Sequence, residues 1–195
     1  FGKATPWVAA KHTPVDFFEI GAMYNNGLSI SKASDNASFR MSYQNQNGTD
    51  VLPNSKLNKN TLSGNASYNI TDNLVGTIGA TYVSQQVTGR NNTGYSGNLI
   101  SGFRQWWATN VDIYDQRNFY LNSGKNYTWN ILGPASLSPS YWNNPYFQRY
   151  ENYSYDTRDR FAGNASLSYD VDKHINLLAR VGFDEYVQRM EDRKA

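Results

Sequence analysis

The sequence predicts an all-β fold: an antiparallel up-and-down transmembrane β-barrel, of which this chain supplies a segment of about six strands. Three observations support this class. Segments of ten or more residues alternate apolar and polar side chains, which is the period of a strand with two unlike faces. Short turns and long loops alternate between these segments, as they do in outer-membrane barrels. The segments also reach the roughly 9–11 residues that a strand needs to cross a bilayer.

Composition narrows the class of protein. The 195 residues are 39% hydrophobic and 17% charged, with a net charge of +2 and a mean hydropathy of −0.68. So small a charge does not favour a nucleic-acid partner. Aromatic residues reach 15% and there are 24 asparagines, which is typical of strands joined by polar loops. The absence of cysteine excludes disulfides, and no apolar run is long enough for a transmembrane helix.

The first four expected strands lie in residues 16–87, after a connector at 1–15. A tight turn at Ser34-Asp35 joins the first pair, and Thr71-Asp72-Asn73 joins the second pair. Between the two pairs we expect a polar connection over 45–59, where Gly and Pro interrupt the alternation. The strands are thus expected as two hairpins.

Residues 88–159 lack the alternation and are expected to form one very long extracellular loop, rich in Asn, Gly, Tyr and Trp. Strands resume over 160–187, around a turn at Asp172-Lys173. The sequence Gly64-Asn65-Ala66-Ser67 recurs as Gly163-Asn164-Ala165-Ser166. Repeated hairpins are the unit of an up-and-down barrel, although four small residues can also recur by chance in this composition.

The apolar face of the expected strands contains many small residues. In a β-sandwich, large side chains fill a gap of about 10 Å between the sheets, whereas lipid does not require side chains to interlock. We therefore expect this face to meet lipid. A soluble, secreted β-sandwich that binds carbohydrate through an aromatic loop is the alternative, and a receptor whose loop docks a protein without transport is a third. The small residues are Gly64, Ala66, Gly76, Ala80, Gly163, Ala165 and Ala179.

Five segments, in this order along the chain, resemble one family. They are Asp16–Gly21, Ser38–Tyr43, Val51–Asn60, Asn143–Tyr146 and Asp156–Arg160. They are similar to the barrel of the SusC/RagA-type TonB-dependent outer-membrane transporters. The resemblance implies a 22-stranded barrel with an N-terminal plug. This chain would then supply about six strands from the middle of the barrel.

The resemblance also implies a location and partners. It places the protein in the outer membrane of a Gram-negative bacterium, where it would import oligosaccharides or peptides. A SusD-like surface lipoprotein would act as its lid, and the TonB–ExbB–ExbD complex would energise it through parts outside this chain. The chain shows no initiator Met, signal peptide, TonB box or plug, so we expect it to be a piece of a longer protein.

Two groups of residues are candidates for function. Four loop tryptophans are candidate contacts for substrate or lid, because aromatic rings stack on sugars and anchor protein contacts. The alternative for the adjacent pair Trp106 and Trp107 is that they pack the loop's own core. Five polar strand residues are expected to face the lumen. The tryptophans are Trp106, Trp107, Trp129 and Trp142, and the strand residues are Arg40, Asn65, Asn69, Asn164 and Arg180.

No catalytic, cofactor or metal site is expected. Asp112 and Asp115 have a spacing that Ca²⁺ can use, but no EF-hand pattern surrounds them, and a solvated loop is the favoured interpretation. His12 and His174 are isolated from other ligand types. The sequence contains no nucleophile elbow and no Gly-rich phosphate loop after a strand, so an enzyme is not expected.

Overall fold

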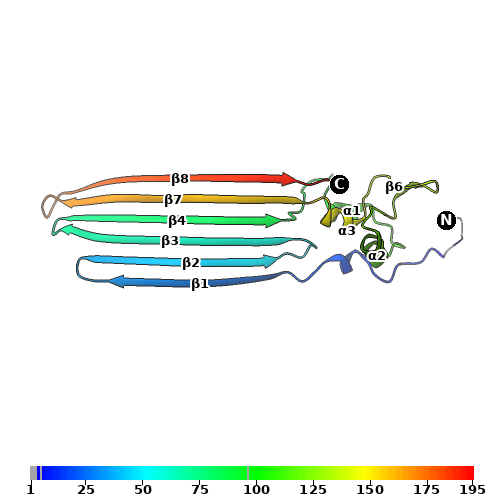
Figure 1. Cartoon of the computed structure of the whole chain (residues 1–195), viewed down its shortest axis with the longest axis horizontal. Helices are drawn as coiled ribbons and strands as arrows, with labels where there is room; N and C mark the ends of the chain where they lie inside the picture. The colour runs from blue at the N-terminus through cyan, green and yellow to red at the C-terminus, as the bar shows by residue number, and fades with distance from the viewer. Residues whose placement is uncertain (1–3, 5, 96) are drawn as a thin grey trace.

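A computed structural model describes the whole chain except residues 1–3, 5 and 96, the first four of which belong to the expected connector and the last to the expected loop. The chain consists of a long six-stranded sheet and a small body of short helices at one end of it (Figure 1). The strands of the sheet are β1 (Ala22–Ala33), β2 (Ala37–Thr49), β3 (Lys56–Thr71), β4 (Leu74–Thr88), β7 (Ser154–Asp170) and β8 (Asn176–Asp192).

The sheet is an antiparallel meander. Its strands follow the order β1-β2-β3-β4-β7-β8, and every neighbouring pair is antiparallel. The prediction of an antiparallel sheet of about six strands is therefore confirmed. The strands are 12 to 17 residues long, against a usual length of about 5–6 residues in globular proteins. The sheet is open, and β1 and β8 are its two edges.

Connections of different length gather at opposite ends of the sheet. Short turns at 34–36, 72–73 and 171–175 lie at one end, and the connections 50–55 and 89–153 lie at the other (Figure 1). The connection after β2 is much shorter than the predicted one. Strand pairing continues there although side chains on both faces are polar, because the ladder is formed by the backbone.

The two faces of the sheet differ as the alternation predicts. One register row runs Phe39, Ala66, Ile78, Ala165 and Val181 from β2 to β8. We call the face that carries this row the apolar face and the opposite one the polar face. Among the described residues, no second sheet packs on the apolar face. The remaining strand pair, β5 (Ile131–Gly133) with β6 (Ser136–Pro139), lies among the helices.

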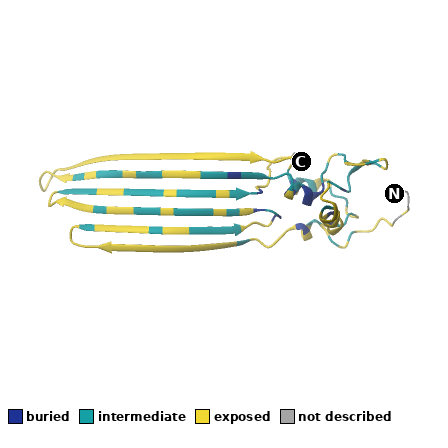
Figure 2. Cartoon of the chain, in the orientation of Figure 1, coloured by how far each residue is buried: buried dark blue, intermediate teal, exposed yellow. Residues whose placement is uncertain are grey.

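The buried hydrophobic core lies beside the sheet, in the helical body (Figure 2). We call this part, residues 89–153 with the N-terminal segment packed on it, the loop body. No apolar stripe in the sequence predicts its helices, which are each shorter than twelve residues. Among the described residues, no helix is long and apolar enough to cross a membrane. The helices are η1 (Pro14–Phe17), α1 (Leu99–Gln105), α2 (Ile113–Ser123) and α3 (Pro145–Tyr150).

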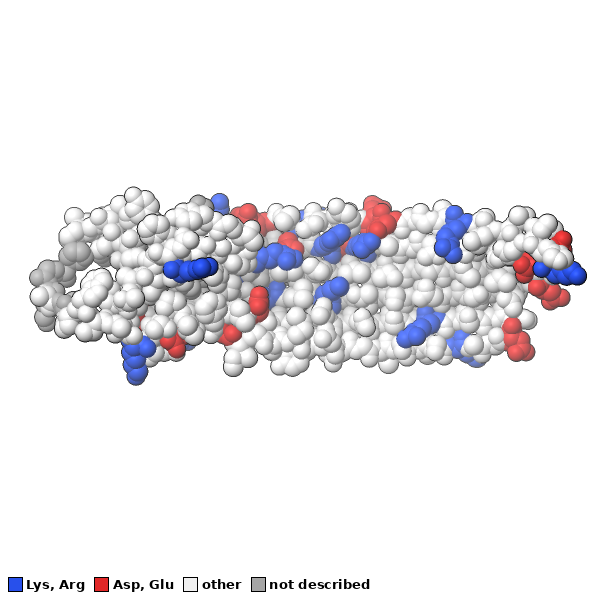
Figure 3. Space-filling model, turned by 180° about the vertical axis from the view of Figure 1, so that it is seen from behind, with Lys and Arg blue, Asp and Glu red and all other residues white. Residues whose placement is uncertain are grey.

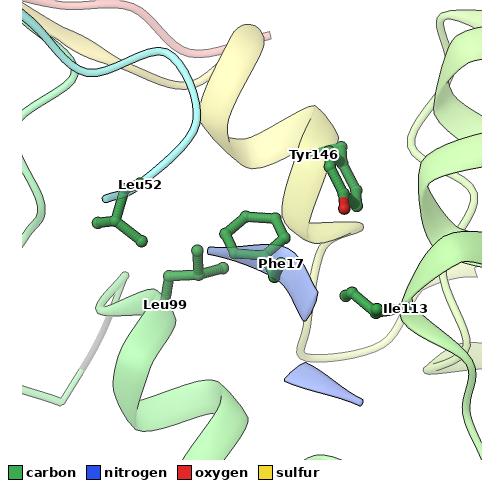
Figure 4. Packing of buried hydrophobic residues seen from close by; sticks show 5 residues of the cluster. All are labelled: Phe17, Leu52, Leu99, Ile113 and Tyr146. Carbon is green, nitrogen blue, oxygen red and sulfur yellow. The ribbon is translucent and has the colours of Figure 1, made fainter. Parts of the chain in front are cut away.

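Phe17 is the centre of this core (Figure 4). Its ring is 1% exposed and meets Tyr146 and Phe103 edge to face, with centroids 4.8 and 5.0 Å away. Leu99 from α1 and Ile113 from α2 complete the contact. Phe17 lies in the stretch from Asp16 that was expected to begin the first strand, but η1 occupies Pro14–Phe17 and β1 begins only at Ala22. Burial and edge-to-face contacts of the Phe17 ring hold this segment in the loop body instead.

Candidate functional site

Three of the predicted lumen-facing residues lie in one row of the polar face. The register pairs Arg40 with Asn65, Asn65 with Gly79, and Gly79 with Asn164. A Cβ atom on Gly79 would lie 2.7 Å from Asn65 Oδ1 and 3.6 Å from Asn164 Nδ2, so both amides lean over the glycine. A shallow groove of about 470 Å³ lies along this row.

The other two predicted residues lie on the same face, nearer the short turns. Arg180 is paired with Ser166, one row from Asn164. Asn69 stands at the end of β3, where its Nδ2 donates to the Asp35 carbonyl at 3.3 Å and its backbone N–H to that of Asn36 at 2.8 Å. Asn69 therefore fastens the β1–β2 turn, whereas Arg180 has a free guanidinium on the exposed strand β8.

Three further cations on the polar face were not singled out from the sequence. Lys59 and Arg158 lie near the loop body, and Arg160 lies one row from Arg158. The Arg160 Nε donates to Asp184 Oδ1 at 2.8 Å. The guanidinium of Arg158 lies 4.3 Å from the centroid of the Tyr186 ring, in cation–π contact. The polar face therefore carries cations at several levels, and one of them, Arg160, is paired with Asp184.

The four tryptophans occupy different environments in the loop body. Trp107 meets Trp129 edge to face at 5.9 Å, and its Nε1 is buried without a hydrogen-bond partner. Trp142 packs on Gly102, where a Cβ atom would lie 3.4 Å from the ring. Trp106 is 49% exposed and stacks on Trp142 at 6.4 Å. Trp107 and Trp129 thus help to pack the loop body, whereas the ring of Trp106 is exposed at its surface.

Asn144 organises the loop body from inside. It is fully buried, and its Nδ2 donates to the carbonyls of Gln116 and Tyr127 at 2.7 and 2.8 Å. Its Oδ1 accepts from the Tyr146 N–H at 2.9 Å and caps α3, with Pro145 as the first helical residue. The segment Asn143–Tyr146, noted for its resemblance, therefore has a structural role here.

Arg149 fixes α3 to the sheet. It is 5% exposed, and its Nε donates to the Pro53 carbonyl at 2.8 Å. Its Nη2 donates to Ser55 Oγ at 2.7 Å and to the Gly89 carbonyl at 2.6 Å. Burial lowers the pKa of the guanidinium, since desolvation disfavours the charged form. The backbone carbonyl of Arg149 also accepts a hydrogen bond from Asn54 Nδ2 at 2.9 Å.

A second anchor joins the end of β4 to the start of β7. Arg90 Nε donates to Asp156 Oδ1 at 2.5 Å and Arg90 Nη2 to Oδ2 at 3.1 Å. These two hydrogen bonds make the pair bidentate, and the Asp156 carboxylate is shielded from water, since Asp156 is 3% exposed. The hydrogen bonds to Asp156 raise the pKa of Arg90. The first residue of the noted segment Asp156–Arg160 is thus a structural carboxylate.

Asp112 is a helix cap and not the solvated carboxylate that was expected. It accepts from the Tyr114 N–H at 2.9 Å, from the His12 N–H at 3.2 Å and from His12 Nδ1 at 3.0 Å. Burial acts to raise its pKa, but these hydrogen bonds outweigh burial and lower it. The His12 ring also stacks on Tyr114 at 4.1 Å. The described residues contain no group of three or more potential metal ligands.

The chain matches no protein-family model and no curated protein sequence. Interpretation of the site therefore rests on the residues themselves. They offer cations, amides and hydroxyls on the polar face and the exposed stack of Trp106 on Trp142 on the loop body.

Proposed function

We propose that this chain forms part of the wall, and one extracellular loop, of a SusC/RagA-type TonB-dependent transporter that imports oligosaccharides or peptides through an outer membrane. In this proposal the apolar face meets lipid, the polar face borders the lumen, and a SusD-like lipoprotein closes over the loop body. The observation that carries the membrane assignment is a bounded apolar band on one face of the sheet.

Aromatic residues border this band on the side of the loop body. Tyr43, Tyr82 and Phe161 share one register row. The next row towards the loop body is polar, and the tyrosine hydroxyls reach into it. Tyr43 Oη donates to Asn60 Oδ1 at 2.7 Å and Tyr82 Oη to Asp159 Oδ1 at 2.9 Å. Tyrosines with an apolar ring and a hydrogen-bonded hydroxyl are typical of a membrane–water boundary.

A second aromatic border lies near the short turns, at Tyr68 and Tyr169. Phe161 and Tyr169 are eight residues apart on β7, which corresponds to about 27 Å along a strand at roughly 3.4 Å per residue. A strand tilt of about 35–45° would reduce this span to about 20 Å, close to the apolar band of roughly 25 Å in outer-membrane barrels. The spacing therefore fits a bilayer.

The side chains inside the band are open to the surroundings. Ile78 is 60% exposed, Leu167 48% and Phe39 40%. Between them lie the small residues of one row, Gly64, Ala80 and Gly163. A lipid environment suits such a surface because it removes apolar atoms from water without demanding interlocking side chains. The distribution of short turns and long connections supports the same orientation, with the short turns periplasmic.

Cysteine labelling tests both location and orientation, since residues 1–195 contain no cysteine. Asn122→Cys, exposed in α2, is expected to react with a membrane-impermeant maleimide on intact cells. Asp172→Cys, exposed in the β7–β8 turn, is expected to react only after the outer membrane is permeabilised. Equal labelling on intact cells, or recovery of the protein in the soluble fraction, would refute the membrane assignment.

Transport itself requires a separate measurement. Cells that produce the full-length protein are expected to accumulate a labelled oligosaccharide or peptide too large for porins, and a protonophore should abolish this uptake. Uptake that survives the protonophore would contradict energised import while leaving the labelling result valid.

A further inference from the structure

The strands of the polar face carry five cations, Arg40, Lys59, Arg158, Arg160 and Arg180, and four carboxylates, Asp156, Asp170, Asp184 and Asp192. Among the described ion pairs of this face, only Arg160 and Asp184 neutralise each other, while Asp156 pairs with Arg90 beyond the end of β4. Figure 3 shows Lys and Arg side chains spread along the sheet. Within the described part of the chain, four cations of the polar face have no carboxylate within ion-pair distance: Arg40, Lys59, Arg158 and Arg180.

These cations lie at two levels of the sheet. The upper level, near the loop body, is a single register row of Asn25, Gln46, Lys59, Gln85, Arg158 and Gln188, one residue from each strand. Every member of this row is an amide or a cation. A groove of about 260 Å³ lies at its β1–β3 end, lined in part by Gln44, Gln46 and Lys59.

The lower level is the row of Arg40, Asn65 and Asn164 over Gly79, with Arg180 in the next row. Ser31, Ser38, Ser67 and Thr77 also line its groove, together with Lys32 and the apolar residues Ala33, Phe39, Ala66 and Ile78. Lys59 and Asn65 are six residues apart on β3, so the two levels are separated by about 20 Å at roughly 3.4 Å per residue. A ligand that moves along the polar face therefore meets the two levels in turn.

We propose that the polar face is a track that selects acidic oligosaccharides, a substrate class within the proposed transport function on which this inference rests. Lys and Arg would pair with the carboxylates of the sugar, as rings of Lys and Arg select anions in pores. The neighbouring amides and hydroxyls both donate and accept, which matches sugar hydroxyl groups. Amides and hydroxyls around each cation favour a sugar over an acidic peptide, whose apolar side chains would need apolar pockets.

The test compares charge-removing variants on the two faces of the sheet. Lys59→Gln with Arg158→Gln removes the upper cations, and Arg40→Gln with Arg180→Gln removes the lower ones. The matched control is Lys56→Gln with Arg189→Gln, because both residues are exposed and lie on the apolar face. The full-length protein, purified in detergent, is titrated calorimetrically with trigalacturonate, with neutral maltotriose and with hexaglutamate.

We expect the wild-type protein to bind trigalacturonate more tightly than maltotriose. Each polar-face double variant should weaken trigalacturonate binding at its own level about tenfold, since two exposed ion pairs together are worth about one factor of ten. The control should bind as the wild type does. Salt should weaken binding of the acidic sugar and leave that of the neutral sugar unchanged, which supplies a readout that does not depend on variant folding.

Several results would overturn the proposal: no trigalacturonate binding by the wild type, equal binding of both sugars, or an equal loss in the control. Equally tight binding of hexaglutamate through the same cations would refute the assignment to a sugar. The cysteine-labelling result is independent of these titrations. A protein that fails the labelling test but binds trigalacturonate selectively would refute the membrane location and retain the ligand class.

Discussion

Replacement of Phe39 by Arg tests the apolar band directly. Phe39 lies on the apolar face, four residues from Tyr43 along β2, which is about 13 Å at roughly 3.3 Å per residue. With a strand tilt of about 40°, this places Phe39 about 10 Å below the aromatic border and hence near the middle of the band. Arginine at the midplane of a barrel wall costs about 2–4 kcal/mol, and near the interface about 0–1 kcal/mol.

The cost should therefore depend on depth. We expect Phe39→Arg to destabilise the full-length protein in lipid vesicles by about 2–4 kcal/mol, and Tyr43→Arg by about 1 kcal/mol or less. Ser38→Arg is the matched control, because Ser38 is the exposed neighbour of Phe39 on the polar face. Stability is measured by urea titration, with the folded fraction read from heat-dependent mobility in a gel. Equal costs at Phe39 and Tyr43, or a larger cost at Ser38, would refute the lipid-facing assignment.

The loop body yields the remaining predictions. Arg149→Met removes the donor to the Pro53 carbonyl and to Ser55 Oγ, while the Gly89 carbonyl keeps the Ser55 hydroxyl as donor, and we expect a loss of about 2–4 kcal/mol of local stability, measured as faster amide exchange in α3. Gly89→Ala should displace the end of β4, since Gly89 has φ 69° and a Cβ atom would lie 2.0 Å from the Asn54 carbonyl oxygen; a crystal structure without displacement would contradict this. The pKa of Asp112 is lowered in the folded protein, so the hydrogen bonds to its carboxylate stabilise the loop body fully at pH values above the unfolded-state pKa of about 3.9. This stability is lost as the pH falls through the lower folded-state pKa. Asp112→Asn should flatten that acid dependence, and an unchanged acid transition would refute the role. Deletion of 96–140 should spare membrane insertion and impair uptake or lid binding, and normal uptake with normal lid binding would remove the loop from the mechanism.

The strands of the sheet could be predicted because their signal is local. Alternation places Phe39 and Met41 on one face and Arg40 on the other without any knowledge of the partner strand. The predicted alternation stops where Asn45 and Asn60 place polar side chains on the apolar face, so that both faces are polar there. The strands continue there because backbone pairing is indifferent to side-chain polarity and because Asn45 Nδ2 donates to Asn60 Oδ1 at 2.7 Å.

The sequence indicates the helices of the loop body more weakly than the strands, through the residues that cap their N-termini. Asn98, Asp112 and Asn144 each accept a hydrogen bond from the first turn of the helix that follows. Asn144 followed by Pro145 is a recognisable helix start. These helices have only 7, 11 and 6 residues, so an apolar stripe cannot establish itself in so few turns.

The anchors of the loop body could not be predicted at all. Arg149 meets Pro53, Ser55 and Gly89, which are 60 to 96 residues away along the chain. Nothing near Arg149 in the sequence distinguishes it from an exposed arginine. Its role exists only once β2, β3 and β4 have brought these three backbone segments together, which makes it a property of the tertiary structure.

These anchors determine how the two candidate surfaces work together. Arg149 and the Arg90–Asp156 pair attach the loop body rigidly to the end of the sheet that carries Lys59 and Arg158. The exposed Trp106 therefore has a fixed position relative to the upper row of cations and amides. A sugar that first stacks on an aromatic ring outside the proposed membrane would next meet carboxylate-pairing groups at the rim of the polar face. Loosening the anchors should then reduce uptake without altering the affinity of the polar face itself, because only the relative placement of the two surfaces would change.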